Sequence, residues 1–224
     1  MSLNVKGWLG LAALAAVMAA LIFAAAGTLD YWQGWVFLAV FFGAATVQGI
    51  DVLRRDPALA RRRLTGGPFA EKESAQRSIM LAISLGFIGL MVVPGLDHRF
   101  GWSSVPLFAV IAGDALIAVG FFIVVLVFRE NPFTAATVAI APDQRVIATG
   151  PYAMVRHPQY VGSFLYLLGT PLALGSWWGV GVFAAMVPFL IWRLVDEERV
   201  LSAGLPGYAE YCRSVRFRLI PGVY

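Results

Sequence analysis

Long apolar runs, separated by short polar connections, dominate the sequence. Four of them, between 18 and 24 residues long, span residues 8–27, 31–50, 79–96 and 105–128, and the only charged residue in them is Asp114. About 18 or more uncharged apolar residues are enough for a helix to cross a hydrocarbon core roughly 30 Å thick. These runs therefore predict four membrane-spanning helices within residues 1–128.

Two shorter apolar runs follow near the C-terminal end of the sequence. They span residues 160–175 and 177–192, are 16 residues long each, and are separated only by Ser176. Such a pair predicts a hairpin of two helices, each short for a full crossing. We place the hairpin at residues 158–195, inside a second region, 129–224, that holds most of the polar chemistry. The predicted fold class is an all-α integral membrane protein.

Composition and charge support a membrane protein and suggest its orientation. Only 13% of the residues are charged, against about 25% in an average soluble chain. The connection at residues 51–77 holds six Arg and one Lys, whereas the connection at 97–104 has only Arg99. Because cytoplasmic loops carry an excess of Lys and Arg, the N-terminus and region 129–224 are both expected in the cytoplasm. The net charge of +4 follows from this bias and requires no nucleic-acid partner.

The first apolar run also fits a second interpretation. Lys6, the apolar stretch after it and the small residues "AAAG" at 24–27 resemble a secretory signal peptide. A signal core has roughly 7–15 apolar residues, and this run has 20. We therefore favour a retained membrane span.

The polar connection "RENPFTAATVAIAPDQRVIATGPYAMVRHPQY", residues 129–160, is unusually long. A connection of 32 residues without secondary structure is uncommon in a folded domain and often functional. Its β-branched runs "TVAIAP" and "RVIATG" predict a small extended or hairpin element. The chain shows no internal repeat, which argues against an inverted-repeat transporter.

The end of this connection, "RHPQY", contains one of the two His residues of the chain. Proline is favoured in the first turn of a helix, where its missing N–H would have no partner. We therefore expect a helix to begin at Pro158, with His157 at its boundary and Arg156 beside it. A helix start with these donors suits an anionic ligand group. Equally, both side chains could be interfacial anchors at the membrane surface.

A second polar stretch, "WRLVDEERVL", follows the hairpin. A hairpin brings its two ends together, so this stretch should lie beside "RHPQY". Arg193 and Glu197 are one turn apart on one helix face, and Glu198 lies about 100° further round the helix. The pair could be an ordinary surface ion pair, but its place at the hairpin mouth favours a ligand cage. Whether Glu197 or Glu198 would meet a ligand stays open.

Several chemistries lack the residues that they need. Two His and one Cys, Cys212, provide neither a metal cluster nor a disulfide framework. No G-x-S-x-G nucleophile motif occurs, and the pattern Gly179-x-Gly181-x-x-Ala184 follows no strand, so it does not indicate dinucleotide binding. Asp114, at mid-depth in the fourth run, is a functional candidate by position or a hydrogen-bonding link between two helices.

Together, "TGPYAMVRHPQYVG", "RLVDEERVL" and "GYAEYCRSVRFRLIP" resemble the isoprenylcysteine carboxyl methyltransferase family over residues 129–221. The resemblance implies an integral membrane enzyme that uses S-adenosylmethionine, with cytoplasmic cofactor-binding segments and no metal. It implies that Arg193 binds the substrate carboxylate and that Glu197 meets the cofactor ammonium. Thr137 is a weak further candidate. The remaining implied cofactor contacts are Gln144, Arg145, Val146, Ile147, Tyr152, His157, Pro158, Gln159 and Tyr160.

The expected function is therefore methyl transfer to the carboxylate of a lipid-like, isoprenylcysteine-type substrate drawn from the membrane. A carboxylate has a reference pKa near 4, so it needs no general base at neutral pH. This agrees with the scarcity of acid–base residues. Alternatives from the same superfamily are a phospholipid or other small-lipid N- or S-methyltransferase and a membrane sterol reductase. A non-catalytic transporter or scaffold is a further alternative, and the oligomeric state is left open.

Overall fold

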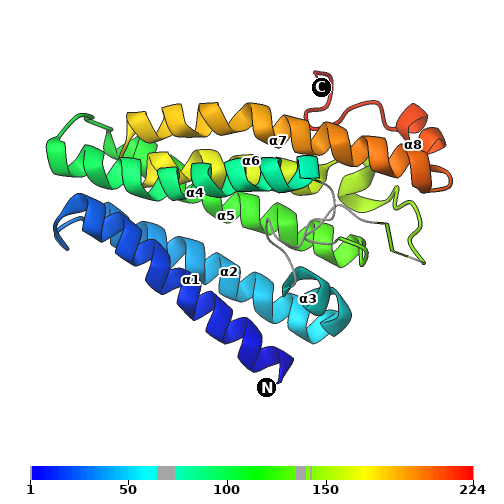
Figure 1. Cartoon of the computed structure of the whole chain (residues 1–224), viewed down its shortest axis with the longest axis horizontal. Helices are drawn as coiled ribbons and strands as arrows, with labels where there is room; N and C mark the ends of the chain where they lie inside the picture. The colour runs from blue at the N-terminus through cyan, green and yellow to red at the C-terminus, as the bar shows by residue number, and fades with distance from the viewer. Residues whose placement is uncertain (1, 65–73, 135–139, 142, 224) are drawn as a thin grey trace.

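A computed structural model describes residues 2–64, 74–134, 140–141 and 143–223, and every regular element within those ranges is a helix (Figure 1). Five helices are long and apolar enough to cross a membrane. The predicted all-α, multi-pass membrane architecture is thereby confirmed. The five long helices are α1 (Leu3–Ala26), α2 (Trp32–Arg55), α4 (Ser74–Phe100), α5 (Leu107–Glu130) and α7 (Trp177–Gly204).

Shorter helices complete the fold. The first arm of the predicted hairpin is α6 (Pro158–Ala173), whose 16 residues make a helix about 24 Å long, shorter than the hydrocarbon core. The hairpin prediction was wrong about the second arm, because α7 continues past residue 195 to Gly204. The other short helices are α3 (Pro57–Leu64), the 3-10 helix η1 (Gly150–Ala153) and α8 (Tyr208–Ser214).

Local sequence signals explain where the helices begin and end. The Ser2 side chain accepts a hydrogen bond from the Val5 N–H at the start of α1, and α1 ends at Gly27, whose φ of 67° is left-handed. Asp56 separates α2 from α3, and its carboxylate accepts from the Leu59 N–H at 2.9 Å. Ser176 caps α7 by accepting from the Gly179 N–H at 2.9 Å. These are the side chains that satisfy unpaired N–H groups at helix starts.

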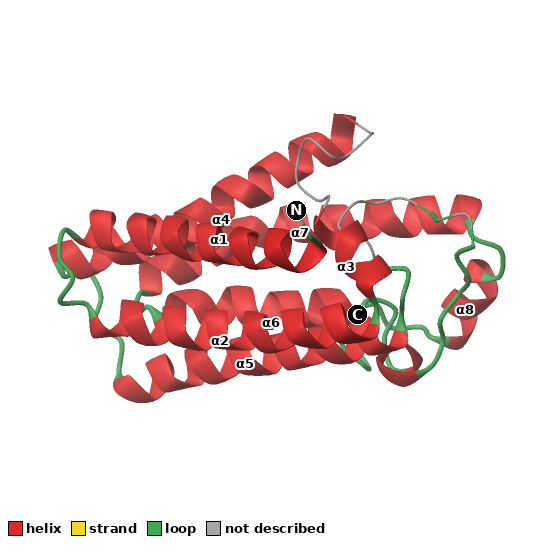
Figure 2. Ribbon diagram, turned by 90° about the horizontal axis from the view of Figure 1, so that it is seen from below, coloured by secondary structure: helices red, strands yellow, loops and turns green. Residues whose placement is uncertain are grey.

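The long helices run side by side, and α3 and α8 lie at the same end of the bundle, called here the α8 end (Figure 1). Helices α1, α4 and α7 pack together, and α2, α5 and α6 form a second group against them (Figure 2). The α5–α6 contact is the closest, because glycines face backbone there. A Cβ on Gly113 would lie 2.3 Å from the Ala173 nitrogen, and one on Gly120 would lie 2.6 Å from the Gly162 oxygen. Small residues allow such approach between membrane helices.

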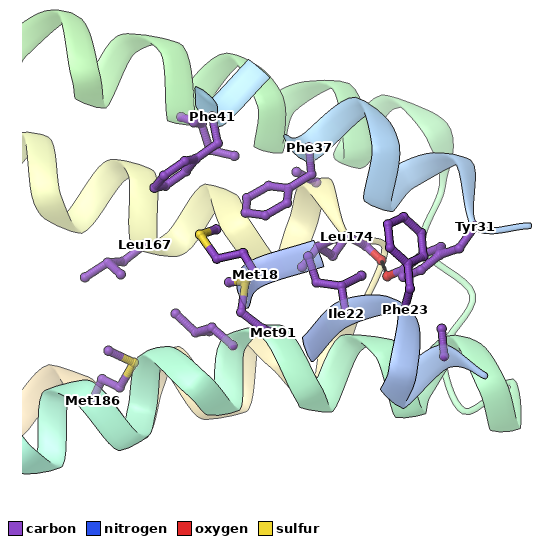
Figure 3. Close-up of a cluster of buried hydrophobic side chains, with 14 of the residues drawn as sticks. Met18, Ile22, Phe23, Tyr31, Phe37, Phe41, Met91, Leu167, Leu174 and Met186 are labelled. Atoms are coloured by element: carbon purple, nitrogen blue, oxygen red, sulfur yellow. Dashed lines mark hydrogen bonds between the residues drawn. The ribbon is translucent and has the colours of Figure 1, made fainter. Parts of the chain in front are cut away.

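The half of the bundle away from α8 is tightly filled. Met18, Ile22 and Met91, from α1 and α4, interlock with Leu174 in one apolar core (Figure 3). The Tyr31 hydroxyl donates a hydrogen bond to the Leu174 carbonyl. At the same end the Asp97 carboxylate accepts from the Ser103 N–H at 2.7 Å and from the Ser176 hydroxyl, which ties α4 to the α6–α7 turn.

The polar connection before α6 differs from its sequence prediction. Its "RVIATG" half, residues 145–150, contains no strand and leads into η1. Thr137 and most of "TVAIAP" lie outside the described residues, as does Lys72 of the basic connection. The hairpin predicted for this connection is therefore not formed by "RVIATG" within the described ranges, because Val146 and Ile147 pack against helices and line the cavity described below, without a strand partner there.

Candidate active site

A cavity of about 650 Å³ opens at the α8 end of the bundle. Helices α1, α4, α6, α7 and α8 and the connection before α6 all contribute walls. Thr137 aside, the cavity is lined by all but one of the residues that the resemblance implies as cofactor or substrate contacts: Gln144, Arg145, Val146, Ile147, Tyr152, His157, Gln159, Tyr160, Arg193 and Glu197. The exception is Pro158, which is buried as the first residue of α6. The structure thus brings together segments about 50 residues apart in the chain.

Three tyrosines form much of the polar end of the cavity. The Tyr211 hydroxyl donates to the Tyr152 carbonyl at 2.8 Å, and Asn131 donates through Nδ2 to the Tyr152 hydroxyl at 3.0 Å. Burial raises the pKa of Tyr152, Tyr208 and Tyr211 above the ordinary tyrosine value. At neutral pH these hydroxyls are therefore protonated. The Tyr208 hydroxyl is buried and has no hydrogen-bond partner within the described residues.

Helix α6 begins at Pro158, as the sequence predicts, and His157 is its N-cap residue. The two residues before Pro158 are held by the C-terminal segment. The Arg156 N–H donates to the Phe217 carbonyl at 2.9 Å, and the His157 N–H donates to the Arg218 carbonyl at 3.0 Å. Residues 217 and 218 of the C-terminal segment therefore hold the start of α6 through their backbone.

Glu198 of α7 strengthens the same junction. Its Oε1 lies 3.1 Å from His157 Nε2 and 3.2 Å from Arg156 Nε, and its Oε2 accepts from Arg218 Nε at 2.7 Å. The residue is 8% exposed and does not line the cavity. Protein groups already engage both oxygens of this buried carboxylate. Glu198 therefore holds the neighbouring residues of the site in position.

Glu197, one residue earlier, is oriented differently. It lines the cavity and accepts a hydrogen bond from the Tyr160 hydroxyl of α6 at 2.8 Å. The two neighbouring glutamates therefore have separate surroundings, because a step of one residue turns about 100° around a helix. Of the two, Glu197 is the one that lines the cavity.

Arg193 lies one turn before Glu197, where the polar end of the cavity meets its apolar part. Its Nη1 donates to Gln76 Oε1 at 2.7 Å, and Gln76 Nε2 donates to the Asp196 carboxylate. Gln76 is 2% exposed. Neither Gln76 nor Asp196 was predicted from the sequence as a site residue, since Gln76 lies in a polar connection three residues before the predicted third span. The sequence signal that could have identified Gln76 is its position, as a polar residue next to the boundary of a predicted span.

Beyond Arg193 the cavity continues as an apolar arm between the helices. Its walls include Leu21 of α1, Phe87 of α4, Leu167 of α6, and Met186 and Leu190 of α7. Leu167 and Met186 belong to the core cluster (Figure 3), so the arm ends where tight packing begins. The cavity is therefore amphipathic along its length.

Two other candidates fall outside this cavity. Asp114 is half-buried on α5 and does not line it, and its Oδ1 has no hydrogen-bond partner in the part of the chain that the structure describes. Thr137 is outside the described residues. Within those residues no group of three or more His, Cys, Asp and Glu side chains could hold a metal ion.

Replacing Glu198 with glutamine is expected to lower the stability of the protein by about 2 kcal/mol, because cations gathered around a buried carboxylate would lose its charge. Thermal unfolding of the detergent-solubilised chain measures the effect. The matched control is Glu210→Gln on α8, whose ion pair with Arg213 is exposed and should contribute at most about 1 kcal/mol. Equal melting temperatures for the two variants would contradict the clamping role of Glu198.

Comparison with known proteins agrees with the sequence motifs. Residues 108–204 match the model of the phospholipid methyltransferase family. A protein-S-isoprenylcysteine O-methyltransferase of Schizosaccharomyces pombe is 35% identical over 75 residues, which cover 33% of this chain and 32% of the relative. The predicted resemblance to membrane methyltransferases is confirmed over this part of the chain.

Two further relatives have names that indicate functions other than methyl transfer. A Delta(14)-sterol reductase of Mus musculus is 31% identical over 107 residues, covering 43% of this chain and 25% of the relative. A nickel-cobalt-cadmium resistance protein of Alcaligenes xylosoxydans is 30% identical over 134 residues, covering 52% of this chain and 62% of the relative. The chain thus spans between a quarter and two thirds of the length of these three relatives.

Proposed function

We propose that this chain is an integral membrane methyltransferase that transfers a methyl group from S-adenosylmethionine to the carboxylate of a lipid-like substrate of the isoprenylcysteine type. The observation that carries the proposal is the cavity itself. One continuous space joins a polar end, lined by the implied cofactor contacts, to an apolar arm, and Arg193 lies between them. The matching of residues 108–204 to phospholipid methyltransferases supports the reaction class.

The residues at the polar end fit S-adenosylmethionine by charge and by hydrogen bonding. Glu197 supplies a carboxylate for the cofactor ammonium, and Arg145 and Arg156 supply cations for its carboxylate. The buried Tyr208 hydroxyl, which has no partner among the described residues, is the kind of group that a ligand satisfies, because buried polar groups are nearly always hydrogen-bonded.

The apolar arm and Arg193 fit the other substrate. A hydrocarbon tail placed in the arm would be removed from water, and its carboxylate would meet the guanidinium at the top of the arm. A planar guanidinium binds a carboxylate through two parallel hydrogen bonds. Gln76 holds one side of Arg193 and so orients the group. Each carboxylate oxygen keeps a second lone pair in such a pair, and for attack the lone pair of one oxygen must face the polar end.

The bound cofactor would supply an already activated methyl group on a sulfonium, so the protein needs to provide neither a metal nor a base for the carboxylate. What the chain contributes is alignment and the exclusion of water. Holding reactants in a near-attack geometry can supply several kcal/mol of rate enhancement. The Glu198 clamp and the C-terminal segment keep the α6 start, and with it His157 and Tyr160, in a fixed position. We place the α8 end and the N-terminus in the cytoplasm, following the arginines of α2 and α3.

The direct test supplies purified protein with methyl-labelled S-adenosylmethionine and a farnesylated cysteine analogue. Methyl transfer to the carboxylate gives label that mild alkali releases, because the product is an ester. Alkali-stable label would indicate N- or S-methylation and overturn the carboxylate assignment, and labelled phosphatidylethanolamine derivatives would favour a phospholipid methyltransferase. No label with any acceptor, together with a nicotinamide-dependent reduction of a sterol, would overturn the methyltransferase proposal.

Gln76→Leu is expected to raise KM for the carboxylate substrate about tenfold while the Kd of S-adenosylmethionine stays within a factor of two. The substitution removes the amide that positions Arg193, and small misplacements of a binding group are costly. Gln48→Leu on α2, outside this cavity, is the matched control. A loss confined to kcat, with KM unchanged, would indicate that Gln76 only supports the fold.

A further inference from the structure

We propose that Met186 is the specificity-determining residue that sets how long a hydrocarbon tail the apolar arm accepts. This inference rests on the proposed function, because it assumes that the arm holds the tail of the methyl acceptor. The property by which the enzyme would select its substrate is the length of the hydrocarbon tail beyond the carboxylate.

The position of Met186 along α7 supports the proposal. Among the residues of α7 that line the cavity, Met186 is the most distant from the α8 end. It lies seven residues before Arg193, which corresponds to about 10 Å along a helix. Its side chain is 3% exposed. A tail whose carboxylate meets Arg193 would therefore approach Met186 after about 10 Å of hydrocarbon.

The packing behind Met186 leaves little room for a longer tail. Leu90 and Met91 of α4 are fully buried in the same cluster as Met186 and do not line the cavity, whereas Met18 of α1, 1% exposed, belongs to the cavity wall. Figure 3 shows Met18 and Met91 close together between the helices, with Met186 further along the same apolar core. Protein interiors are packed at nearly crystalline density, so a tail could advance only where a side chain moves. Methionine is the flexible side chain that allows such adjustment.

The Met186 side chain occupies space next to α4 that is open because Gly86 has no side chain. A Cβ at Gly86 would lie 2.4 Å from Cγ of Met186 and 2.7 Å from its Sδ. These separations are shorter than contacts between carbon atoms, whose optimum is about 3.5–4.0 Å. A side chain at position 86 would therefore displace Met186, and the open space beside it is the arm. Gly86 and Met186 together define how deep the arm is.

The experiment measures kcat/KM of the full chain with three thioether acids that carry geranyl, farnesyl or geranylgeranyl tails. Met186→Ala is expected to raise the geranylgeranyl-to-geranyl ratio about tenfold, because pocket discrimination of one methylene alone is worth about 10- to 200-fold. Gly86→Ala is expected to lower the same ratio, since the displaced methionine shortens the arm. Ratios within one preparation do not depend on the fraction of folded protein.

The double variant separates displacement of Met186 from a general loosening of α4 and α7. Gly86→Ala combined with Met186→Ala should behave like Met186→Ala, because no methionine remains to be displaced. The control is Gly181→Ala on α7, where an added Cβ meets no atom within 4 Å, and its ratio should equal that of the unchanged protein.

The outcomes distinguish this inference from the proposed function. Methyl transfer to all three acids with ratios insensitive to positions 86 and 186 would overturn the role of Met186 and indicate that the tail does not reach this residue. The proposed function would stand in that case. Absence of transfer to any carboxylate acceptor by the unchanged protein would overturn the proposed function and this inference with it.

Discussion

Arg193→Gln is expected to lower kcat/KM for carboxylate methylation by about 30- to 3,000-fold, while the affinity for S-adenosylmethionine changes by no more than a few-fold. Removing one partner of a desolvated, hydrogen-bonded charge pair costs about 2–5 kcal/mol, and each 1.4 kcal/mol is a factor of ten. In the proposed function the affected group is the substrate carboxylate, because Arg193 lies where the apolar arm begins, at the boundary of the polar end. Initial rates with labelled cofactor and the farnesylated cysteine analogue measure the loss.

The control for Arg193→Gln is Arg199→Gln, six residues later on α7. Arg199 pairs with Asp196, its side chain is largely exposed, and it does not line the cavity. Its replacement should leave kcat/KM within about twofold, as is usual for surface substitutions. If Arg193→Gln methylated the carboxylate as fast as the unchanged protein, the acceptor would not be bound through Arg193, and an amine acceptor would become the better hypothesis.

The helices that cross the membrane could be predicted from sequence because the bilayer imposes a simple condition. Every backbone N–H and C=O within the hydrocarbon must be paired locally, so a long apolar run becomes a helix. The runs at 8–27 and 105–128 agree with α1 and α5 to within two residues at Ala26, where α1 ends, and at Leu107, where α5 begins. The start of α6 was equally predictable, since Pro158 carries a local signal that does not depend on the rest of the fold.

The contacts that complete the site could not be predicted in this way, because they depend on how helices lie against one another. Nothing local to Gln76 indicates that α4 places it beside Arg193, 117 residues later. The spacing of Glu197 and Glu198 showed that they face different directions, but not which of them faces the cavity. That choice follows from the C-terminal segment, whose Arg218 lies on the Glu198 side.

The length of α7 shows a limit of hydropathy as a guide. The apolar run ends at Trp192, yet the helix continues through "RLVDEERVL" to Gly204. Arg193 and Glu197 are therefore on the same rigid helix as Met186, and the distance between the polar and apolar parts of the cavity is fixed by helix geometry. The division of the chain at residue 128 stays a prediction, and the cavity draws walls from both sides of it, including Leu21 and Phe87.

Glu197→Gln is expected to weaken the binding of S-adenosylmethionine about 100-fold. Glu197 is the carboxylate that lines the cavity within the described part of the chain, and the amide would remove the charge that we propose for the cofactor ammonium. The loss corresponds to about 2.7 kcal/mol, since a factor of ten is about 1.4 kcal/mol, and it lies within the range for truncating a buried charge pair. The Tyr160 hydroxyl can still donate to the amide oxygen, so the helix contact with α6 should persist.

Thermal unfolding with and without cofactor measures this effect independently of turnover. Cofactor at 100 times the Kd of the unchanged protein should stabilise that protein by about 2.7 kcal/mol, and the same concentration should stabilise Glu197→Gln by only about 0.4 kcal/mol. Glu198→Gln should show the opposite pattern, because it lowers the stability without cofactor and leaves the ammonium contact in place. If Glu197→Gln kept the full stabilisation by cofactor, the ammonium would be bound by another group, and the assignment of Glu197 would be wrong.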